Sequence, residues 1–419
     1  MKQLQKIPFN WKETTLNHCV SSMRSGLSRL LSETDIGIPV LRSCNIGIKY
    51  PVFENLKFWY ELDPEGANTS SYILKNGDIL VNFINSISQI GKTCIFRNDI
   101  GRDCIYTTNI LRLIPNKNIL GEFLFLITQM DRYNWYITTI TKPAVNQASF
   151  TTKDFKKYLF LLPPLPEQKA ITDLLSTWDQ AIERTEMLIK VKEKQFKWLL
   201  LTLMSEPSHK TGNNEWKKVK LGEVCKVTTG QSAPQDLSIF TNSGFPFIRV
   251  SSLDLLLGRS DSVQTEYITK TKGHELKMTL FKPGTILFAK SGMSALQARV
   301  CKLKEPSFIV SHLCALIPSS NIHEDFLMYY LMKYHPNRLI QGDGFPSIKT
   351  SEVSSLKILL PPFEEQKKIV EMLSFVQQEI NLLKQLAEKY KTQKRGLMQK
   401  MLTGKWRVKP EIINQYKGE

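Results

Sequence analysis

The chain repeats itself, and this constrains its fold more than any other feature. The segment LLPPLPEQK at 161–169 returns as LLPPFEEQK at 359–367. Three more pairs of segments occur in the same order upstream of these motifs: WK at 11–12 and 216–217, IPVLR at 38–42 with FPFIR at 245–249, and KNGDIL at 75–80 with KPGTIL at 282–287. Chance does not explain an ordered set of matches, so we predict two copies of one domain-plus-helix unit.

A long helix is predicted after each LPP motif. Pro163 and Pro164 block a helix upstream of the motif. Pro166 suits a first helical position, and Glu167 favours the positive end of the helix dipole. Apolar side chains then recur at steps of three and four residues, or multiples of these: Leu175, Trp178, Ile182, Ile189, Phe196, Leu199 and Leu203 in the first copy, and Ile369, Leu373, Val376, Ile380, Leu383, Ala387, Tyr390, Leu397 and Met401 in the second.

Each stripe predicts a helix of about 39 residues, or about 58 Å at 1.5 Å per residue. Thr185, Lys192 and Lys394 are the polar breaks in the stripes. Such lengths suit a coiled coil better than a core helix. Either each stripe packs on its own domain or the two stripes pair with each other. We expect pairing, which must be antiparallel if the two domains lie at opposite ends.

We therefore expect an α+β protein with a pseudo-two-fold internal repeat. Two mixed α/β domains are separated by two long antiparallel helices that form a coiled coil. Within the domains, short β-rich runs are bounded by Gly and Pro, and helices are expected near 122–133 and 324–334. The predicted divisions are a first domain at 1–160, a first long helix at 161–206, a linker at 207–215, a second domain at 216–358, a second long helix at 359–404 and a C-terminal tail at 405–419.

Charge and size narrow the class of protein. At 419 residues the chain is long for one core, and its formal net charge of +17 is typical of proteins with a polyanionic partner, most often nucleic acid. Basic ribosome-associated and membrane-surface proteins share this balance. The apolar stretches 159–165 and 199–203 are far shorter than the roughly 20 residues that cross a bilayer. The N-terminus has no signal-peptide core, and the cysteines form no CxxC pair. We expect a reduced, cytoplasmic protein without a membrane partner.

No motif for catalysis is found in the sequence. A methyltransferase would need a glycine-rich strand-to-helix turn and an NPPY-like loop, whereas both PP pairs lie in LPPL or LPPF. GKT at 91–93 resembles the end of a phosphate-binding loop, but Ser86 stands where its first glycine would be. The carboxylates Glu61, Asp63 and Glu65 have no twin in the second copy, and the histidines lack metal-ligand spacing. We expect no catalytic residue, no cofactor and no metal.

The duplicated order of a WK start, a G-D/T-I-L strand, an LPP-x-x-EQ motif and a long helix resembles the specificity subunits of type I restriction–modification systems. The resemblance spans nearly the whole chain. Its most specific segments are the two LPP…EQ motifs, GTILFAKSG at 284–292 and LTGK at 402–405. The first copy departs from the pattern, because VNFIN at 81–85 places Phe83 where the second copy has Lys290.

The resemblance implies a non-catalytic subunit that recognises a DNA sequence. In that family each variable domain, or target recognition domain, reads one half of a split, asymmetric site in double-stranded DNA. The helices act as a ruler and bind two modification (methyltransferase) subunits, and restriction subunits join afterwards. The cofactor, methyl transfer and ATP-driven cleavage then belong to those partner subunits, so DNA methylation and cleavage need the whole complex.

The contacts to DNA are expected from loops around each domain. Lys and Arg supply salt-dependent attraction to phosphate, while Arg or Lys pairs with guanine and Asn or Gln with adenine. The candidates are Arg24, Arg42, Asn82, Asn85, Lys92, Gln231, Arg249, Lys290, Ser291 and Arg299. The alternative for each is a solvated surface side chain, and for Arg42 and Arg249 a structural partner of the neighbouring strand. Two heads about one turn of B-DNA apart, about 34 Å, would face the same side of the duplex.

Two further groups recur in both copies. Trp11 and Trp216 start the domains, where a core anchor is preferred to a base-stacking role. The helix starts share a carboxylate and an amide that either cap the helix or dock a modification subunit, and both interpretations stay open: Glu167, Gln168, Glu365 and Gln366.

Two rival functions remain. One is a duplicated binding module for structured RNA or for protein, with the helices as dimerisation elements. The other is an enzyme with an unrecognised site. A filter-binding comparison of duplex DNA with RNA separates the first rival, and an activity assay of the purified chain tests the second.

The second strand-loop gives one direct test. We predict that Lys290→Ala weakens binding to the second half-site, because a lysine in this loop can contact a phosphate or a guanine. A mobility-shift titration at low salt measures the change. Unchanged affinity would count against a DNA contact from Lys290.

Overall fold

The computed structural model describes residues 7–144, 147–205, 216–258, 265–340 and 344–417. The chain forms two compact units. Unit 1 consists of Met1–Thr185 and Gln385–Glu419, and unit 2 of Glu186–Lys384. The boundaries between the units therefore fall inside the two long helices. The linker predicted at 207–215 lies outside the described residues.

Unit 1 is built on a four-stranded antiparallel sheet with the strand order β2-β9-β5-β7. Smaller sheets of order β4-β3-β8, β10-β11-β6 and β1-β12 complete the strands described in this unit. The strands are β1 (Lys12–Thr15), β2 (Val20–Ser25), β3 (Ile38–Leu41), β4 (Lys57–Trp59), β5 (Ile79–Asn82), β6 (Ile84–Asn85), β7 (Thr93–Ile95), β8 (Ile105–Tyr106), β9 (Ile110–Pro115), β10 (Lys142–Pro143), β11 (Ala148–Ser149) and β12 (Leu159–Leu162).

Unit 2 repeats this topology. Its sheets have the orders β14-β20-β17-β18, β16-β15-β19 and β13-β21, which match the three sheets β2-β9-β5-β7, β4-β3-β8 and β1-β12 in order and direction. The strands are β13 (Lys217–Lys220), β14 (Cys225–Thr229), β15 (Phe245–Ile248), β16 (Glu266–Ile268), β17 (Ile286–Ala289), β18 (Val300–Lys302), β19 (Phe308–Ile309), β20 (Leu313–Pro318) and β21 (Lys357–Leu360). The predicted internal duplication is thus confirmed as a duplicated fold.

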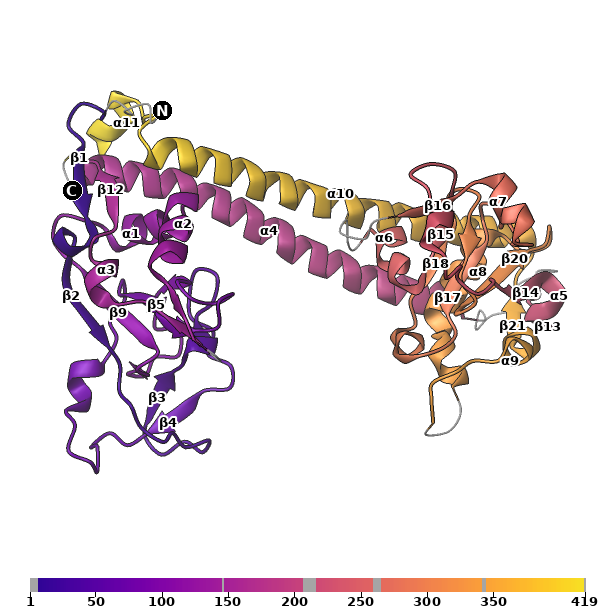
Figure 1. Cartoon of the computed structure of the whole chain (residues 1–419), viewed down its shortest axis with the longest axis horizontal. Coiled ribbons are helices and arrows are strands. Elements are labelled where there is room, and N and C mark those ends of the chain that lie inside the picture. The colour runs from indigo at the N-terminus through magenta and orange to yellow at the C-terminus, as the bar shows by residue number, and fades with distance from the viewer. Residues whose placement is uncertain (1–6, 145–146, 206–215, 259–264, 341–343, 418–419) are drawn as a thin grey trace. The chain divides into compact units, whose positions relative to one another are not determined.

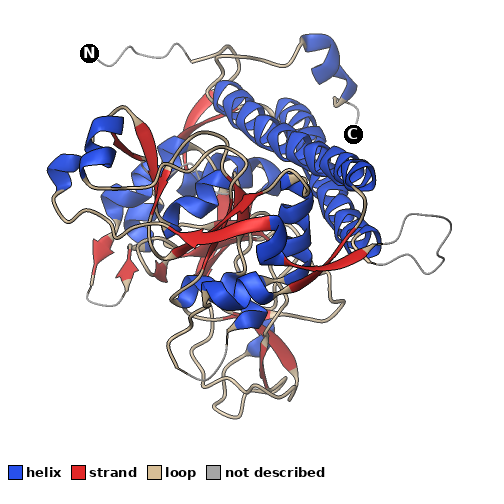
Figure 2. Ribbon diagram, turned by 90° about the vertical axis from the view of Figure 1, so that its right-hand side faces the viewer, coloured by secondary structure: helices blue, strands red, loops and turns tan. Residues whose placement is uncertain are grey.

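Figure 2 shows that the chain mixes helices with strands. In Figure 1, α1 and α2 lie between α4 and the strands of unit 1, while β3 and β4 lie at its far end. The α-helices are α1 (Gly121–Thr128), α2 (Asp131–Ile140), α3 (Thr152–Phe155) and α4 (Leu165–Leu203), then α5 (Leu221–Val224), α6 (Leu253–Leu256), α7 (Lys270–Glu275), α8 (Glu324–Tyr334), α9 (Thr350–Ser355), α10 (Phe363–Leu402) and α11 (Pro410–Gln415).

The helix predicted near 122–133 is two helices, whereas its twin α8 is one. The break between α1 and α2 lies at Gln129 and Met130. The side-chain amide of Gln129 donates to the hydroxyl of Thr93 on β7 over 2.8 Å, and Met130 is buried with extended backbone. These contacts with the sheet end the first helix, and the spacing of apolar residues along the chain does not encode them.

The long helices have the predicted lengths, 39 residues for α4 and 40 for α10. In unit 1 the first part of α4 packs on the last part of α10, with the Trp178 and Tyr390 rings edge to face at 5.8 Å. In unit 2 the last part of α4 packs on the first part of α10, where Lys192 and Glu379 form an ion pair of 2.8 Å. The helices therefore pair in antiparallel directions, as predicted.

The charged breaks in the two apolar stripes have partners on the opposite helix. Lys192 pairs with Glu379 on α10, and Lys394 on α10 pairs with Asp179 on α4. Each lysine can extend its apolar stem along the helix interface while its ammonium meets a carboxylate. The breaks thus form cross-helix ion pairs instead of interrupting the packing.

A tryptophan and a glutamate hold the start of each long helix against its unit. In unit 1 the indole Nε1 of Trp11 donates to Oε2 of Glu167 over 2.9 Å, and both residues are buried. In unit 2 Trp216 Nε1 donates to Oε1 of Glu365 over 3.1 Å. Strand pairing brings the partners together, because β1 and β13 follow the tryptophans while β12 and β21 lead into the helices. The tryptophans are core anchors.

The glutamine beside each glutamate closes the same junction. Gln168 donates to the carbonyls of Pro163 and Asn118, each over 2.9 Å, and accepts from Leu120 N–H at 2.9 Å. Gln366 repeats this set, donating to the carbonyls of Pro361 and Asn321 and accepting from His323 N–H. The LPP-x-x-EQ motif thus ties the helix start to the loop before α1 or α8.

The segment predicted as a C-terminal tail packs on unit 1. The guanidinium of Arg407 donates to both carboxylate oxygens of Glu167, at 2.9 and 2.6 Å, and to the Phe9 carbonyl at 3.1 Å. The hydrogen bonds that Arg407 donates to Glu167 raise the pKa of Arg407 above its ordinary value. Val408 is also buried against the core of unit 1. The tail therefore neutralises a buried carboxylate at the start of α4.

Two glycines at equivalent places leave no room for a side chain. A Cβ on Gly26 would lie 2.0 Å from the carbonyl oxygen of Tyr106, and one on Gly230 would lie 1.9 Å from that of Ile309. Each glycine follows the first strand of its four-stranded sheet and lets the chain approach the neighbouring strand closely. Backbone contacts at such distances allow no larger residue.

We predict that Gly230→Ala lowers the free energy of unfolding by about 3 kcal/mol, because the added methyl group must displace backbone. Gly396→Ala is the control. Gly396 lies exposed in α10 with no atom near its Cβ position, so this variant should gain about 0.5–1 kcal/mol. Urea unfolding measures both changes. Equal effects of the two variants would contradict the close approach at Gly230.

We predict that Arg407→Ala destabilises the protein by about 2–3 kcal/mol, because the buried Glu167 carboxylate loses its cation. The double variant Arg407→Ala/Glu167→Gln should recover most of that loss, since a neutral amide can still accept from Trp11. Arg395→Ala is the control, because Arg395 pairs with Asp131 at the exposed surface and should matter by less than about 1 kcal/mol. A double variant as unstable as Arg407→Ala in urea unfolding would refute this account.

Candidate nucleic-acid interface

The strand-loops after β5 and β17 have the same backbone frame. In unit 1 the Phe83 N–H donates to the carbonyl of Asn109 over 3.2 Å, and Ile84 on β6 pairs with Ser149 on β11. In unit 2 the Lys290 N–H donates to the carbonyl of His312 over 2.9 Å. There Ser291 forms a β-bridge with Ser347. Each unit thus presents one loop from the end of a central strand, held by two segments distant in sequence.

The second strand-loop brings two of the predicted residues to the surface of unit 2. Lys290 is half-buried, and its carbonyl accepts a hydrogen bond of 2.7 Å from Ile348 N–H. The Ser291 hydroxyl lies 2.7 Å from Nδ1 of His312, so the two side chains form a hydrogen-bonded pair. Gly292 follows with φ of +75°, a backbone conformation that favours glycine.

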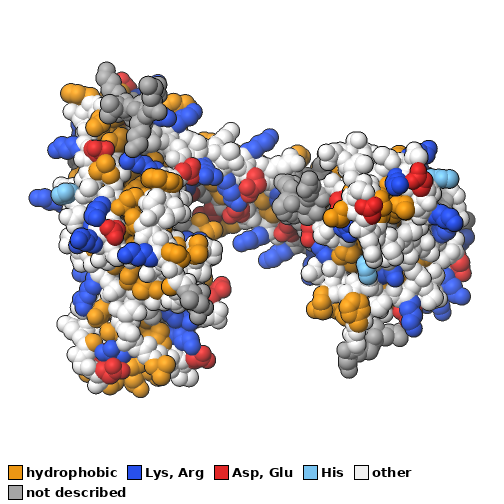
Figure 3. Space-filling view, in the orientation of Figure 1, with side chains coloured by type: hydrophobic (Ala, Val, Ile, Leu, Met, Phe, Trp, Pro, Cys, Tyr) orange, Lys and Arg blue, Asp and Glu red, His pale blue; other side chains and the backbone are white. Residues whose placement is uncertain are grey.

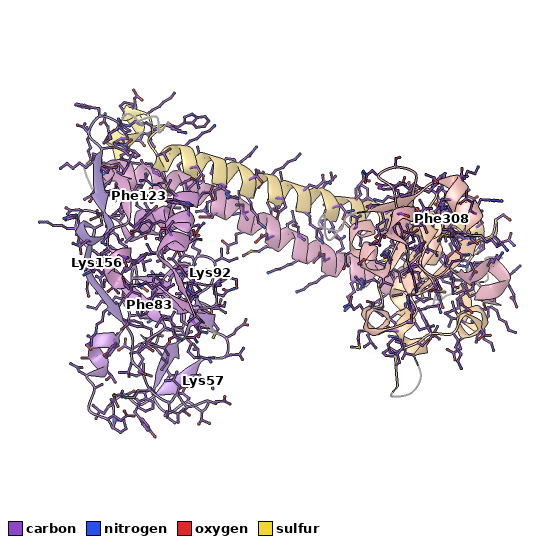
Figure 4. All side chains as sticks on the ribbon, in the orientation of Figure 1. Lys57, Phe83, Lys92, Phe123, Lys156 and Phe308 are labelled. Atoms are coloured by element: carbon purple, nitrogen blue, oxygen red, sulfur yellow. The ribbon has the colours of Figure 1, made fainter. Side chains whose placement is uncertain are left out.

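The first strand-loop differs from the prediction at Asn82. This side chain is 1% exposed, and its Nδ2 donates to the Ser43 carbonyl over 3.2 Å. Buried in the sheet, Asn82 has no exposed amide with which to read a base. Asn85 is half-buried, and its side-chain oxygen accepts from Ser86 N–H. Lys92 is exposed at the edge of the unit and donates to Gln89 over 2.7 Å (Figure 4).

Three of the four predicted arginines have structural partners in their own unit. Arg42 donates to the Asn55 carbonyl over 2.9 Å and begins a short 3-10 helix. Arg249 occupies the equivalent place and pairs with Glu266 at 2.6 Å. Arg299 is largely buried and pairs with Asp254 at 2.5 Å. The structural alternative that the sequence left open for Arg42 and Arg249 therefore describes their contacts.

The two remaining candidates also contact other side chains of their own unit. Arg24 is exposed on β2, with its guanidinium 4.2 Å from the centroid of the Tyr72 ring. Gln231 donates to the Thr279 hydroxyl over 2.9 Å and accepts from Thr279 N–H at 3.2 Å. Of the ten predicted residues, Arg24, Lys92, Lys290 and Ser291 combine exposure or partial exposure with an accessible polar group; Lys290 and Ser291 share one loop of unit 2, while Arg24 and Lys92 lie at separate places in unit 1.

The four side chains considered for docking at the helix starts already form hydrogen bonds inside the fold. Glu167, Gln168 and Gln366 are buried, and Glu365 is half-buried and bonded to Trp216. A partner subunit would have to displace hydrogen bonds that close each unit in order to reach them. The arrangement favours the structural interpretation of these four residues over docking.

Other exposed or half-buried residues at the strand-loops were not named as DNA contacts from the sequence. His312 and Asn109 stand at equivalent places, one residue before β20 and β9. Phe345 and Gln147 precede the segments that pair with the loops, and both are exposed. A comparison of the two repeats could have revealed these residues, because the strands correspond between the copies while the side chains next to them differ.

The visible surface carries scattered cations. Lys and Arg side chains are spread over both units with Asp and Glu between them (Figure 3). No single basic stripe dominates this face. The net charge of +17 therefore favours attraction to a polyanion in general but does not by itself locate an interface.

Asp63, which the sequence raised as a candidate for catalysis, has a structural partner. Within the described part of the chain, no group of three or more His, Cys, Asp or Glu side chains is placed to hold a metal ion. Asp63 is bound to Arg29 at 2.8 Å. Burial raises the pKa of the Cys301 and Cys314 thiols to about 12, so they stay protonated. No helix among the described residues has both the length and the apolarity to span a bilayer.

Comparisons with known proteins agree with this architecture. The family model described as the type I restriction modification DNA specificity domain matches residues 47–204 and 213–391. A putative type I restriction enzyme specificity subunit of Methanocaldococcus jannaschii, MjaX, is 28% identical over 429 residues, covering 97% of this chain and 96% of that protein. The MjaIX specificity subunit of the same organism is 27% identical over 368 residues, covering 80% of this chain and 79% of that protein.

Solved structures show the same fold. The crystal structure of a type I restriction–modification S subunit from M. genitalium has a TM-score of 0.57 at 15% identity, covering 96% of this chain and 97% of that one. A chain from a study of complex assembly in the type I R-M system has a TM-score of 0.55 at 19% identity, covering 94% and 98%. Because the family model matches twice and spans most of the sequence, the chain belongs to the type I restriction modification DNA specificity family and carries two copies of its domain.

Proposed function

We propose that this chain is the DNA sequence-recognition subunit of a type I restriction–modification complex. It reads a bipartite, asymmetric site in double-stranded DNA, with one unit for each half-site. The observation that carries the proposal is the pair of strand-loops with one backbone frame and different side chains. Phe83 is replaced by Lys290, and Asn109 by His312.

Different side chains on one frame are what an asymmetric site requires. Hydrogen bonds and apolar contacts to base edges specify sequence, whereas phosphate contacts fix position. An exposed amide such as that of Gln147 suits adenine, while lysine suits guanine or phosphate. Two related units that present unlike groups therefore select unlike half-sites.

The long helices are proposed to set the spacing between the half-sites. Both α4 and α10 are shared between the units and run without a break. Their pairing is supported in unit 1 by Lys394 with Asp179 and in unit 2 by Lys384 with Glu193 at 2.6 Å. A paired helix bends less than a single one, so the spacer between half-sites should have a fixed length.

Two modification subunits and the restriction subunits are the proposed protein partners. The glutamate and glutamine side chains of the LPP-x-x-EQ motifs already form hydrogen bonds inside the fold, so the partner subunits need another surface on which to dock. The long helices offer one in unit 2, where Met187, Val191 and Trp198 on α4 and Phe375 and Leu382 on α10 are exposed apolar side chains. Exposed apolar stretches on a helix are typical of protein interfaces.

The chain itself is proposed to be non-catalytic and to work in the cytoplasm, where the partner subunits supply the chemistry. Two of the side chains considered for catalysis have partners within their own unit, Asp63 in Arg29 and Lys92 in Gln89. Binding, not turnover, is therefore the activity to measure for the purified chain.

We predict that duplexes selected from a randomised DNA library by the full chain contain two unlike half-sites with a fixed spacer. The selected duplex should bind at least about 1,000-fold more tightly than random duplex at physiological salt. Filter binding with RNA duplex as competitor gives the comparison, and raising the salt concentration should weaken binding steeply. Equal binding of RNA, or a selection that returns no motif, would refute DNA sequence recognition.

A further inference from the structure

We propose that His312, Met293 and Phe345 form a base-reading surface in unit 2 and that its apolar part contacts the 5-methyl group of a thymine in the major groove. The inference rests on the proposed function, since it names residues that would discriminate bases in one half-site. None of the three was among the residues expected from the sequence.

The backbone under this surface is fixed by hydrogen bonds from three segments. The Gly292 N–H donates to the Pro346 carbonyl over 2.9 Å, and the Ile348 N–H donates to that of Lys290 over 2.7 Å. The His312 carbonyl accepts from Lys290 N–H, as described above. A reading surface needs such a frame, because loosely held side chains discriminate poorly between bases.

His312 is held in one orientation and keeps one ring nitrogen for a ligand. Its Nδ1 lies 2.7 Å from the Ser291 hydroxyl, while the residue as a whole is exposed. The second ring nitrogen, Nε2, is then the group that can meet a base edge. A single directed nitrogen can distinguish a donor from an acceptor in the major groove, where each base pair shows its own pattern.

Met293 and Phe345 are large apolar side chains exposed beside this pair. Met293 is 70% exposed and Phe345 is 76% exposed. The Phe345 ring lies beside the residue that precedes Met293, because a Cβ built on Gly292 would lie 3.6 Å from Cζ of that ring. An apolar pair next to one polar nitrogen matches a base pair that offers a thymine methyl group beside a hydrogen-bonding edge.

The first unit argues for DNA over a protein partner here. At the equivalent places it has Asn109 and Gln147, which are polar amides. A partner subunit that docks on both units through this loop would need the same chemistry in both. Half-sites of different sequence would instead need unlike chemistry, as is found. The long helices, by contrast, carry the apolar surface suited to protein partners.

The test is selection from a randomised duplex library with the full-length chain, comparing wild type with Phe345→Ala, Met293→Ala and His312→Ala. We expect each variant to lose base preference at one or two adjacent positions of a single half-site, with the other half-site unchanged. Affinity for the wild-type duplex should fall roughly 5- to 100-fold. Leu276→Ala, which removes an exposed leucine after α7 in the same unit, is the control and should leave the motif unchanged.

A second arm tests the methyl group directly. Replacing the selected thymine by uracil should weaken wild-type binding but leave binding by Phe345→Ala unchanged, because that variant has already lost the contact. Unfolding curves in urea confirm that each variant is folded, which the exposure of the three side chains makes straightforward.

The outcomes separate this inference from the proposed function. If wild type selects two half-sites but the variants select the same motif, the base-reading surface is refuted and the proposed function stands. A uniform loss of affinity at an unchanged motif also overturns it, because that result marks a phosphate contact or a protein interface. If wild type selects no motif, DNA sequence recognition itself fails.

Discussion

Each long helix is attached to its unit by a hydrogen bond from a tryptophan to a glutamate, which is buried in unit 1 and partly buried in unit 2. A carboxylate removed from water needs charge-assisted partners, and Glu167 has them in Trp11 and Arg407. Gln168 closes the same junction through three backbone groups. The recurrence of the bond between Trp216 and Glu365 shows that the motif is a joint between domain and helix.

A joint that recurs in both units allows the rest of each unit to differ. The strand-loops after β5 and β17 use the same backbone hydrogen bonds, yet they present Phe83 in one unit and Lys290 in the other. Because the frame is made by main-chain groups, side chains at its surface can change without cost to the sheet. Such a separation of frame from surface suits the proposed recognition of different sequences by the two units.

The polar breaks in the helix stripes show how two long helices keep their alignment. Lys192 and Lys394 would be misplaced in an apolar seam, but each meets a carboxylate on the opposite helix. Sliding one helix along the other would separate these pairs and leave charges against apolar side chains. Polar groups within a seam commonly fix the alignment of paired helices at some cost in stability.

The sequence by itself determined the duplication and the lengths of α4 and α10, and it favoured the antiparallel pairing of these helices and the anchor role of the tryptophans. These features follow from the spacing of apolar residues and from the repeated motifs, both of which can be seen in the sequence alone. Only the tertiary structure decided that Asn82 is buried, that Arg249 and Arg299 are paired with carboxylates, and that Phe345 lies beside Gly292. The physical reason is that burial and contact depend on segments far apart in the chain, about which one side chain's type and neighbours along the sequence carry no information.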